Sequence, residues 1–583
     1  MSNAGKKKRT ERSQPTLSLC MIVKNEEELL GQCLESVQDV VDEMIIVDTG
    51  STDRTVEIAE NFGAKIYHHP WQGSFSEARN YGLQFATCDW VLQLDADEAL
   101  EREDIPLLKK TIQPNRYAVL FVKILNESKE GWTMHYFQRL FRRGKAVYAG
   151  IVHNQLVYRG NDLVTEIRVY HYGYNLSKEI MAAKHGRTEA LLLKQLEEDP
   201  TNPFHYQNYV RILRAQRKFE EGVRAGRKAM VVCLDRMEDY HFQMIAFDTA
   251  NCLMGLGRAE EAEMLCRRVL KEHPDNMDIL YVLAGSLNKQ KTYQEAVDAY
   301  RRYLAINEKT TGLNPQLIYD TYSMAHKAWA LISNCCFEMG DLEGAQEAAE
   351  KAIALRPEIS MYKIPLARIL LEKNRVEEAE KLLNTEHTEN QANPEFYKRW
   401  AKLCVKYPFM GNPLEKLTLG LERHPDSDDL LNEYGYAVQQ SNPQAAKKHW
   451  KKAIQINPLH IGAHAGLAQL YGREARSDAL EIHADVILER CHQKGLLKEI
   501  GRTCMNMQLY SKAVDLFTRC LSIEPEDADS LTDVATCYAR MGQYEASFLG
   551  YKEALRLSPQ NPTILEKMRH LQREMEQSMA EPS

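Results

Sequence analysis

The first part of the chain alternates short apolar runs with amphipathic stretches. The amphipathic stretches at about 51–62 and 75–85 have the spacing of helices. Strand–helix alternation with apolar strands predicts a mostly parallel sheet covered by helices, and such sheets bind ligands at the carboxyl ends of their strands. The apolar runs predict strands at Leu17–Val23, Met44–Val47, Lys65–His68 and Trp90–Leu94, followed by strands without assigned partners at Tyr117–Leu125, Gln138–Phe141 and Ile167–Tyr170.

From about 202 to 572 the pattern becomes helical and repetitive. Pro525 and Pro559 lie 34 residues apart, Pro458 lies about two such periods before Pro525, and Pro357 about three before Pro458. Small and aromatic residues recur at fixed offsets before these prolines. A 34-residue period resembles tetratricopeptide (TPR) repeats, in which each repeat is a pair of antiparallel helices. The length fits about nine or ten repeats.

These two sequence patterns predict a Rossmann-like α/β domain followed by an all-α solenoid. The stretch Thr310–Asp320 interrupts the helical period and is interpreted as an insertion. The expected organisation is a flexible basic tail at 1–15, the α/β domain at 16–175, a helical connector at 176–202, the solenoid at 203–575 and a flexible tail at 576–583.

Composition excludes several classes of protein. The net charge of −8, from 74 basic and 82 acidic residues, argues against nucleic-acid binding. The 13 cysteines include no CxxC pair, so they are interpreted as reduced core residues of a cytoplasmic protein. No apolar run approaches the roughly 20 residues that span a bilayer. Basic residues Lys6–Arg9 ahead of the apolar Leu17–Val23 imitate a signal peptide, but the run is short and ends in charges.

Acidic residues follow two of the predicted strands. In Leu94-Asp95-Ala96-Asp97-Glu98, two carboxylates flank a small residue directly after a buried strand. Such oxygen ligands suit Mg²⁺ or Mn²⁺ and leave coordination positions open for phosphate. Asp48 ends another strand ahead of a glycine turn and a Ser51 cap, where its carboxylate is placed to accept a nucleobase N–H.

Two further motifs complete the set. Met21–Glu27 also lies at a strand's carboxyl end, and Phe75–Gly82 forms a helix on which Arg79 is placed to face a phosphate. The ordered set VKNEE, VDTGSTDRT, FSEARNYG and LDADE, within about 16–175, resembles the family 2 glycosyltransferases with the GT-A fold.

The resemblance implies a nucleotide-sugar donor, UDP-linked by family habit, a divalent metal (Mn²⁺ or Mg²⁺), and an inverting displacement at the anomeric carbon. It also implies that the Tyr170–Tyr174 element closes the donor site, and it gives Asp97 a catalytic role. The residues it implies for the donor nucleotide are Val23, Asn25, Glu26, Asp48, Arg79, Asn80, Asp95 and Ala96. The metal ligands it implies are Asp95, Asp97 and His171.

The sequence leaves three alternatives for the general base. Relatives often carry a His-Glu pair after an RLF-type strand, and here Asn154 stands where the glutamate is expected. Since asparagine cannot act as a base, either His153 serves, another acid moves in, or the acceptor is itself acidic, such as a thiol. Arg139, Lys184 and Arg187 are weaker candidates for phosphate or acceptor contacts, and a solvated charged face is their simpler interpretation.

A donor-binding domain fused to a long solenoid predicts a protein or peptide acceptor held in the TPR groove. The architecture resembles bacterial TPR-tailed glycosyltransferases, including the sublancin-type peptide S-glycosyltransferases. One alternative is synthesis of a surface polysaccharide or lipid-linked glycan, as in the similar lipopolysaccharide-core glucosyltransferases. A second alternative is a catalytically retired scaffold, against which the intact Asp48, Asp95 and Asp97 argue. The sugar and any homo-oligomer formed through the repeats stay open.

Overall fold

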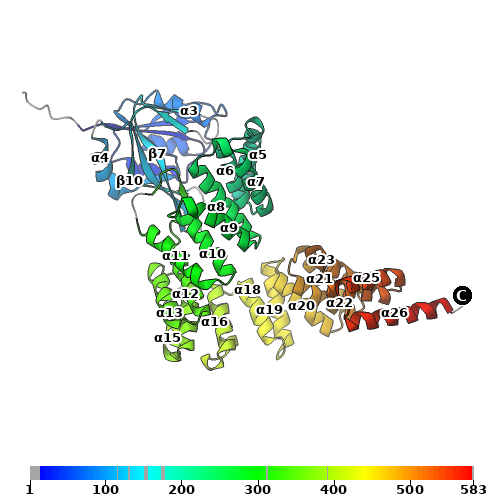
Figure 1. Ribbon diagram of the computed structural model, residues 1–583. Coiled ribbons are helices and arrows are strands. Elements are labelled where there is room, and N and C mark those ends of the chain that lie inside the picture. Colours follow the sequence, from blue (N-terminus) through cyan, green and yellow to red (C-terminus); the bar gives the residue numbers. More distant parts are fainter. Residues whose placement is uncertain are drawn as a thin grey trace, which may run out of the picture. The chain divides into compact units, whose positions relative to one another are not determined.

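The chain divides into two compact units, Met1–Arg356 and Pro357–Ser583. The computed structural model (Figure 1) describes residues 14–113, 116–128, 131–149, 155–172, 178–309, 313–389 and 392–580. The first unit holds an α/β domain and the helices that follow it, and the second unit is helical throughout its described part.

The α/β domain is built on one large sheet in the order β3-β2-β1-β4-β7-β6-β10-β5, with β8 and β9 as a separate antiparallel pair. Its strands are β1 (Leu17–Val23), β2 (Glu43–Asp48), β3 (Lys65–His68), β4 (Trp90–Gln93), β5 (Glu98–Leu100), β6 (Val119–Ser128), β7 (Gly131–Arg142), β8 (Ala146–Ala149), β9 (Gln155–Tyr158) and β10 (Asp162–His171). Its helices are α1 (Leu30–Val37), α2 (Thr55–Asn61), α3 (Phe75–Leu83), the 3₁₀ turn η1 (Arg102–Asp104) and α4 (Ile105–Ile112).

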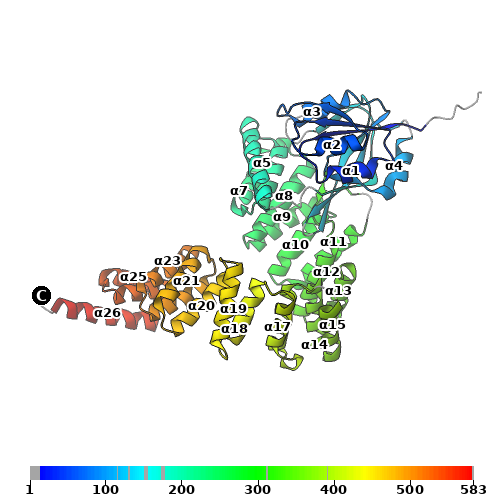
Figure 2. The same ribbon diagram turned by 180° about the vertical axis from the view of Figure 1, so that it is seen from behind.

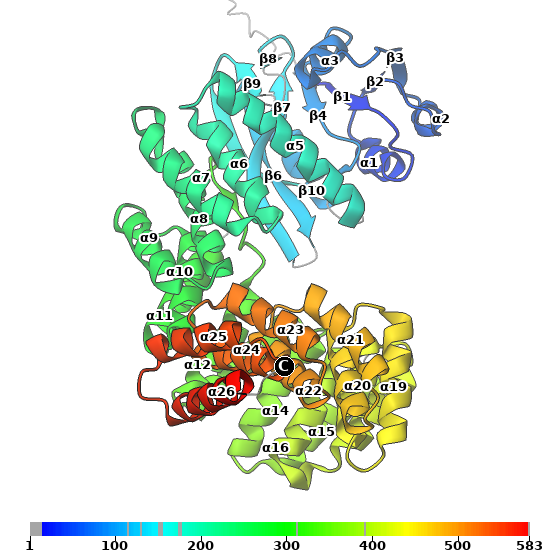
Figure 3. The same cartoon turned by 90° about the vertical axis from the view of Figure 1, so that its right-hand side faces the viewer.

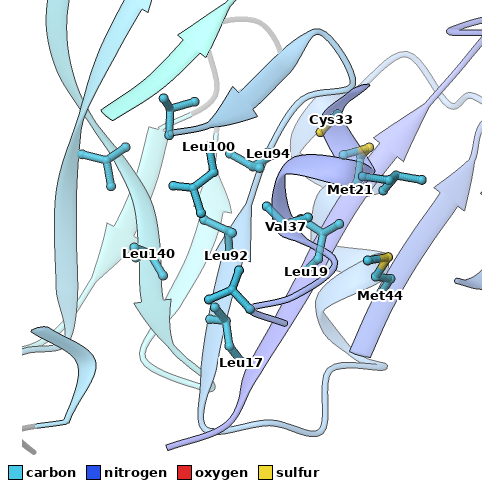
Figure 4. Packing of buried hydrophobic residues seen from close by; sticks show 14 of the residues in the cluster. Leu17, Leu19, Met21, Cys33, Val37, Met44, Leu92, Leu94, Leu100 and Leu140 are labelled. Atoms are coloured by element: carbon cyan, nitrogen blue, oxygen red, sulfur yellow. The ribbon is translucent and has the colours of Figure 1, made fainter. Parts of the chain in front are cut away.

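Both faces of the sheet are covered, as the apolar strands require. On one face Leu17, Leu19 and Met21 of β1 join the buried core formed with α1, α2 and α4 (Figure 4). On the other face Cys20 packs in a second core that includes Leu83 at the end of α3. Figure 2 shows α1, α2 and α3 around the strands of this domain.

The predicted strands are confirmed, and the α/β fold class with them. The sheet is mixed, because β1, β2, β3 and β4 pair in parallel whereas β7 is antiparallel to both β4 and β6. The pattern at Tyr117–Leu125 corresponds to β6, which lies between β7 and β10. The short strands β5, β8 and β9 were not predicted.

The TPR solenoid is also confirmed. Within the described residues, α6 to α25 form ten consecutive helix pairs (Figure 1). Among the same residues, no helix has the length and apolarity needed to cross a membrane. In the first unit the helices are α5 (Lys178–Glu198), α6 (Pro203–Ala215), α7 (Phe219–Val232), η2 (Leu234–Arg236), α8 (Asp239–Gly255), α9 (Ala259–Glu272), α10 (Met277–Lys289), α11 (Tyr293–Asn307), α12 (Ala325–Glu338) and α13 (Leu342–Leu355).

The helices of the second unit continue the same pattern of pairs and end in a single long helix. They are η3 (Ser360–Tyr362), α14 (Lys363–Glu372), α15 (Val376–Glu389), α16 (Pro394–Lys406), η4 (Pro408–Met410), α17 (Pro413–Arg423), α18 (Asp428–Val438), α19 (Pro443–Ile456), α20 (Ile461–Arg473), α21 (Ser477–Arg490), α22 (Lys494–Asn506), α23 (Tyr510–Ile523), α24 (Ala528–Arg540), α25 (Tyr544–Leu557) and α26 (Pro562–Ala580).

Local sequence sets the helix boundaries. Several helices begin at an Asn-Pro pair; at Asn202, for example, the side chain accepts hydrogen bonds from the first free N–H groups and the proline fits the first turn. The turns inside helix pairs take a left-handed residue, as at Gly257 and Gly542. Lys291 and Gln508 hold the same conformation, each 34 residues from one of these glycines.

The interruption of the helical period has a structural counterpart. Between α11 and α12 the chain forms β11 (Ile318–Tyr319), which pairs antiparallel with β7 and places Ile318 opposite His135. Nearby, the Trp132 N–H donates to Ser323 Oγ at 2.6 Å. The insertion between solenoid helices therefore adds a strand to the sheet of the α/β domain.

Candidate active site at the carboxyl ends of the parallel strands

The loops after β1 and β2 are joined by hydrogen bonds. Asn25 has a positive φ of 54°, its Oδ1 accepts from the Thr52 N–H at 2.7 Å, and its N–H donates to Ser51 Oγ at 3.0 Å. The Glu26 N–H donates to Thr55 Oγ1 at 2.7 Å. These contacts give Asn25 and Glu26 a clear role in fixing the two loops. Their contact with a nucleotide stays a prediction.

Asp48 lies buried at the end of β2. Its Oδ1 accepts from the Ser51 N–H at 3.0 Å, and its Oδ2 lies 3.2 Å from His68 Nδ1 at the end of β3. Burial by itself would raise the pKa of Asp48, but the hydrogen bonds from Ser51 and His68 outweigh it and lower that pKa. Beside it, the Val23 carbonyl accepts from the Thr49 N–H at 3.0 Å. His68 was not predicted as a site residue.

Two arginines and two carboxylates meet behind the loop after β4, and we call Arg79, Asp95, Glu98 and Arg139 the loop cluster. Arg79 Nη2 donates to Asp95 Oδ1 at 2.6 Å, and Arg139 Nη2 lies 2.9 Å from Asp95 Oδ2 and 2.5 Å from Glu98 Oε1. The Asp95 N–H donates to Glu98 Oε2 at 3.0 Å. The simpler interpretation of Arg139 from the sequence, a residue on a solvated charged face, is wrong, because its side chain is only 8% exposed.

The cluster sets the charge state of its members. Burial by itself would raise the pKa of Asp95, but the charges of Arg79 and Arg139 outweigh it and hold the pKa well below its usual range. Burial raises the pKa of Glu98, and Arg139 offsets this only in part. The Asp95 side chain is 32% exposed while both arginines are 8% exposed, so the carboxylate is the member that solvent or a ligand reaches.

Asp97 and His171 form a separate pair. Asp97 Oδ2 lies 3.2 Å from His171 Nε2, and the Tyr172 N–H donates to the Asp97 backbone carbonyl at 2.9 Å. Burial would lower the pKa of His171, but the hydrogen bond and the charge of Asp97 raise it overall. No group of three metal-binding side chains occurs in the described part of the chain. A carboxylate and an imidazole still fit a Mg²⁺ or Mn²⁺ site completed by substrate phosphates and water.

The Asn80 side chain forms hydrogen bonds within the α/β domain. Its Nδ2 donates to the Tyr148 carbonyl and its Oδ1 accepts from the Tyr148 N–H, both at 2.8 Å. The Arg79 guanidinium lies 5.2 Å from the centre of the Tyr148 ring. The amide therefore fixes β8 beside the loop cluster, and its contact with a nucleotide stays a prediction. Ala96 is buried between the two aspartates of its loop.

Several predicted residues lie elsewhere. His153 and Asn154 lie outside the described residues, and so does the side chain of Lys184. Arg187 is exposed on α5. The basic tail expected at 1–15 also falls almost wholly outside the described part.

A cleft of about 630 Å³ opens beside the loop cluster, and Arg79, Asp95 and Arg139 line one end of it. The rest of its lining comes from β6, β7, β9, the solenoid helices α6 and α8, and the insertion. These residues are Phe121, His135, Tyr136, Phe137, Gln138, Gln155, Leu156, Tyr158, Phe204, Gln207, Asn208, Tyr240, Met244, Pro315, Gln316, Leu317 and Ile318. Figure 3 shows the strands and the helices that contribute to it.

His135 is a cleft residue that the sequence reasoning missed. Its Nδ1 lies 3.2 Å from Asn126 Nδ2, and burial, followed by the charges of Arg139 and Arg211, lowers its pKa to about 3. The imidazole is therefore neutral at physiological pH. The available signal was a titratable residue inside an apolar strand, which Arg139 shares.

Comparisons with known proteins agree with this architecture. The family model for glycosyl transferase family 2 matches residues 18–169, and the tetratricopeptide repeat model matches 247–309 and 337–394.

Three relatives illustrate the similarity. A TPR repeat-containing protein of Synechococcus elongatus is 31% identical over 355 residues, which is 58% of this chain and 76% of that protein. The SPbeta prophage-derived glycosyltransferase SunS of Bacillus subtilis is 27% identical over 311 residues, 50% of this chain and 74% of that protein. An uncharacterized glycosyltransferase of Rickettsia felis is 37% identical over 112 residues, 19% of this chain and 39% of that protein. The chain belongs to the family 2 glycosyltransferases that carry C-terminal tetratricopeptide repeats.

Proposed function

We propose that this protein is an inverting, metal-dependent glycosyltransferase that moves a sugar from a UDP-sugar to a protein or peptide acceptor. The observation that carries the proposal is the convergence of the predicted loops at one edge of the sheet. Asp48 ends β2, the loop after β4 supplies Asp95 and Asp97, and α3 and β10 bring Arg79 and His171 to that loop. Ligands of parallel α/β sheets bind at this edge.

Each residue then has a proposed role. Asp48, ionised by its hydrogen bonds, accepts an N–H of the base. Asp95 exposes its carboxylate toward the ribose and diphosphate, and Arg79 and Arg139 supply positive charge behind it. Asp97 and His171 hold Mn²⁺ or Mg²⁺. When bound, the metal neutralises the charge that develops on the departing diphosphate.

The acceptor also needs a base as it attacks the anomeric carbon. His153 stays our proposed base, on the position of its motif after β7. His135 is unsuited to that task, because a group with a pKa of about 3 binds a proton too weakly at neutral pH. Its neutral ring is suited to hydrogen bonding in the cleft.

We also propose a reducing compartment, the cytoplasm. All thirteen cysteines lie in the described residues, and every one is buried and free of disulfide bonds. Burial raises the pKa of several of these thiols, for example Cys20 and Cys266, each to about 12, which makes them poor nucleophiles.

A thermal-shift panel tests the donor site. UDP, GDP, ADP and CMP are each added with Mn²⁺ or EDTA to the wild type, to Asp97→Ala and to the surface control Asp39→Ala. A bound ligand at a hundredfold excess over its Kd stabilises the native state by about 2.7 kcal/mol. We expect a Mn²⁺-dependent shift with UDP in the wild type and in Asp39→Ala only. A full shift in Asp97→Ala contradicts the metal assignment, and no shift with any nucleotide contradicts the donor site.

A further inference from the structure

The cleft beside the loop cluster joins parts of the chain that lie far apart in sequence. One wall is formed by β7 and β9 of the α/β domain, and the facing wall by α6 and α8 of the first solenoid repeats. The third side is the insertion at 315–318. Because Asp95 lies at one end, whatever occupies the cleft is close to the proposed donor site.

One buried group in this cleft has an unmet hydrogen bond. Gln207 on α6 is 6% exposed, and its Oε1 has no hydrogen-bond partner among the residues that the structure describes. A buried carbonyl oxygen of this kind is usually paired. Because this oxygen is itself buried, a ligand that brings an N–H or O–H donor would complete it once the Gln207 amide turns toward the cleft.

The remaining lining favours a polypeptide. Away from the loop cluster it is made of uncharged amides, such as Gln155 and Asn208, and of aromatic or aliphatic groups, such as Tyr240 and Met244. Among the described residues, β9 pairs only with β8, so the N–H and C=O groups of its second edge have no strand partner there. Extended peptides commonly bind by adding to such an edge. A glycan could contact the amides and the aromatic rings, but it has no peptide backbone with which to pair with the edge of β9.

The insertion is fixed from two directions. β11 ties it to β7, and Asp320 ties it to α6 by ion pairs with Arg211 and with Arg214, the latter at 2.5 Å. Asp278 on α10 accepts hydrogen bonds from the N–H groups of Asp320 and Thr321 at 2.9 and 3.0 Å. The third side of the cleft is therefore held in place by the solenoid. We call Arg211, Arg214, Asp248, Asp278 and Asp320 the brace cluster.

We propose that this cleft is the acceptor site and that the acceptor is an extended polypeptide segment. One peptide N–H of the segment donates to Gln207 Oε1, and the side chain to be modified points toward Asp95. This inference rests on the proposed function and deepens it, because it assigns acceptor recognition to the first two repeats and the insertion rather than to the solenoid at large.

The test uses the full chain with Mn²⁺ and a set of UDP-sugars, from which the donor is first chosen by the same thermal-shift measurement. The acceptor probes are a synthetic library of 12-residue random peptides containing Ser, Thr, Cys or Asn, and an array of free oligosaccharides; sugar addition is read by mass. Gln207→Leu removes the carbonyl while nearly keeping volume, Tyr240→Ala removes an aromatic wall, and Gln294→Leu on the exposed face of α11 is the matched control.

We expect the wild type to modify a subset of the peptides. Gln207→Leu and Tyr240→Ala should each raise the KM for the best peptide about tenfold, with kcat and the nucleotide shift unchanged, while Gln294→Leu matches the wild type. An unchanged KM in both cleft variants overturns the proposal. So does modification of oligosaccharides but not peptides, or no peptide product from an enzyme that binds its donor. A wild type without any nucleotide shift would instead contradict the proposed function itself.

Discussion

The loop cluster and the brace cluster are both built from two arginines and buried carboxylates, yet they expose opposite members. In the loop cluster the arginines are 8% exposed and Asp95 is 32% exposed. In the brace cluster Arg211 and Arg214 are 27% and 24% exposed, whereas Asp248 is 2% exposed. The first cluster presents a carboxylate to a cleft, and in the second the arginines are more exposed than the carboxylates with which they pair.

The charge balance differs as well. The loop cluster has two carboxylates for two arginines, with Asp95 shared by both, whereas the brace cluster has three carboxylates for two arginines. Burial, followed by the charge of Asp320, raises the pKa of Asp278, and burial raises that of Asp248. The same kind of contact thus leaves a carboxylate reachable in the loop cluster and keeps the carboxylates covered in the brace cluster.

The largest expected effect is on the loop cluster. Arg139→Met keeps the side-chain length but leaves Asp95 and Glu98 without a shared partner, and removing one member of a buried ion pair costs about 4 kcal/mol. We expect faster amide hydrogen exchange in β4 and β7 by a corresponding amount, together with loss of UDP binding. Normal protection of both strands would show that Arg79 alone balances the cluster.

The second effect separates the two clusters. Asp320→Asn leaves Arg211 and Arg214 without their common carboxylate, and we expect a loss of about 3 kcal/mol, less than for Arg139 because both arginines reach solvent. Hydrogen exchange should rise in α6 and in the insertion. The Kd for UDP should stay within about twofold of the wild type; a tenfold weakening would mean that the brace also shapes the donor site.

A carboxylate at the opposite edge of the sheet sharpens the contrast, since it has no arginine. Glu43 accepts from Ser18 Oγ, from Thr87 and from Lys65 Nζ; burial opposes ionisation, but these hydrogen bonds lower its pKa to about 2. The pKa of Glu43 is lower in the folded state than its unfolded value near 4.5. Its ionised carboxylate therefore stabilises the folded state above about pH 4.5, and this stabilisation is lost as the pH falls toward 2.

We therefore expect Glu43 to contribute about 3 kcal/mol to the free energy of unfolding at pH 7. In Glu43→Gln the steep part of the stability curve between about pH 5 and pH 2 should flatten, because the group that takes up the proton is gone. Stability is followed by thermal shift across this range. An unchanged acid slope would assign it to other carboxylates.

The smallest expected effect is on an exposed ion pair of the same domain. Arg102 Nη2 lies 2.7 Å from Asp39 Oδ2, but the two side chains are 54% and 64% exposed. Solvent screens such a pair, so Arg102→Ala should change the free energy of unfolding by less than about 1 kcal/mol. A larger loss would mean that exposure is a poor guide to which ion pairs matter here.

Much of the fold could be predicted because its signals are local. The strand at Leu17–Val23 has apolar residues at six of its seven positions, and it forms β1 with those bounds. The period of 34 places the turns of the solenoid, since each helix pair repeats the same packing. β9 could not be predicted in this way, because four residues with alternating exposure resemble a loop.

The candidate site was predicted only in part, for the same reason. Asp48, Asp95 and Asp97 directly follow predicted strands, so their placement at one edge followed from the fold class. Arg139 and His135 lie within β7, and Gln207 lies about seventy residues later on α6. Their shared location depends on the pairing of distant segments, which single-sequence patterns do not encode.

By itself the sequence determined the two architectures and the loops that carry acidic residues, because apolar periodicity and turn residues act over a few positions. Only the tertiary structure decided that Arg139 pairs with Asp95 and Glu98 at the candidate site, and that an insertion 180 residues further along the chain adds a strand to the same sheet. Strand pairing and ion pairing join residues by distance in space, and both depend on how the whole first unit packs. The cleft between sheet, helices and insertion exists only at that level.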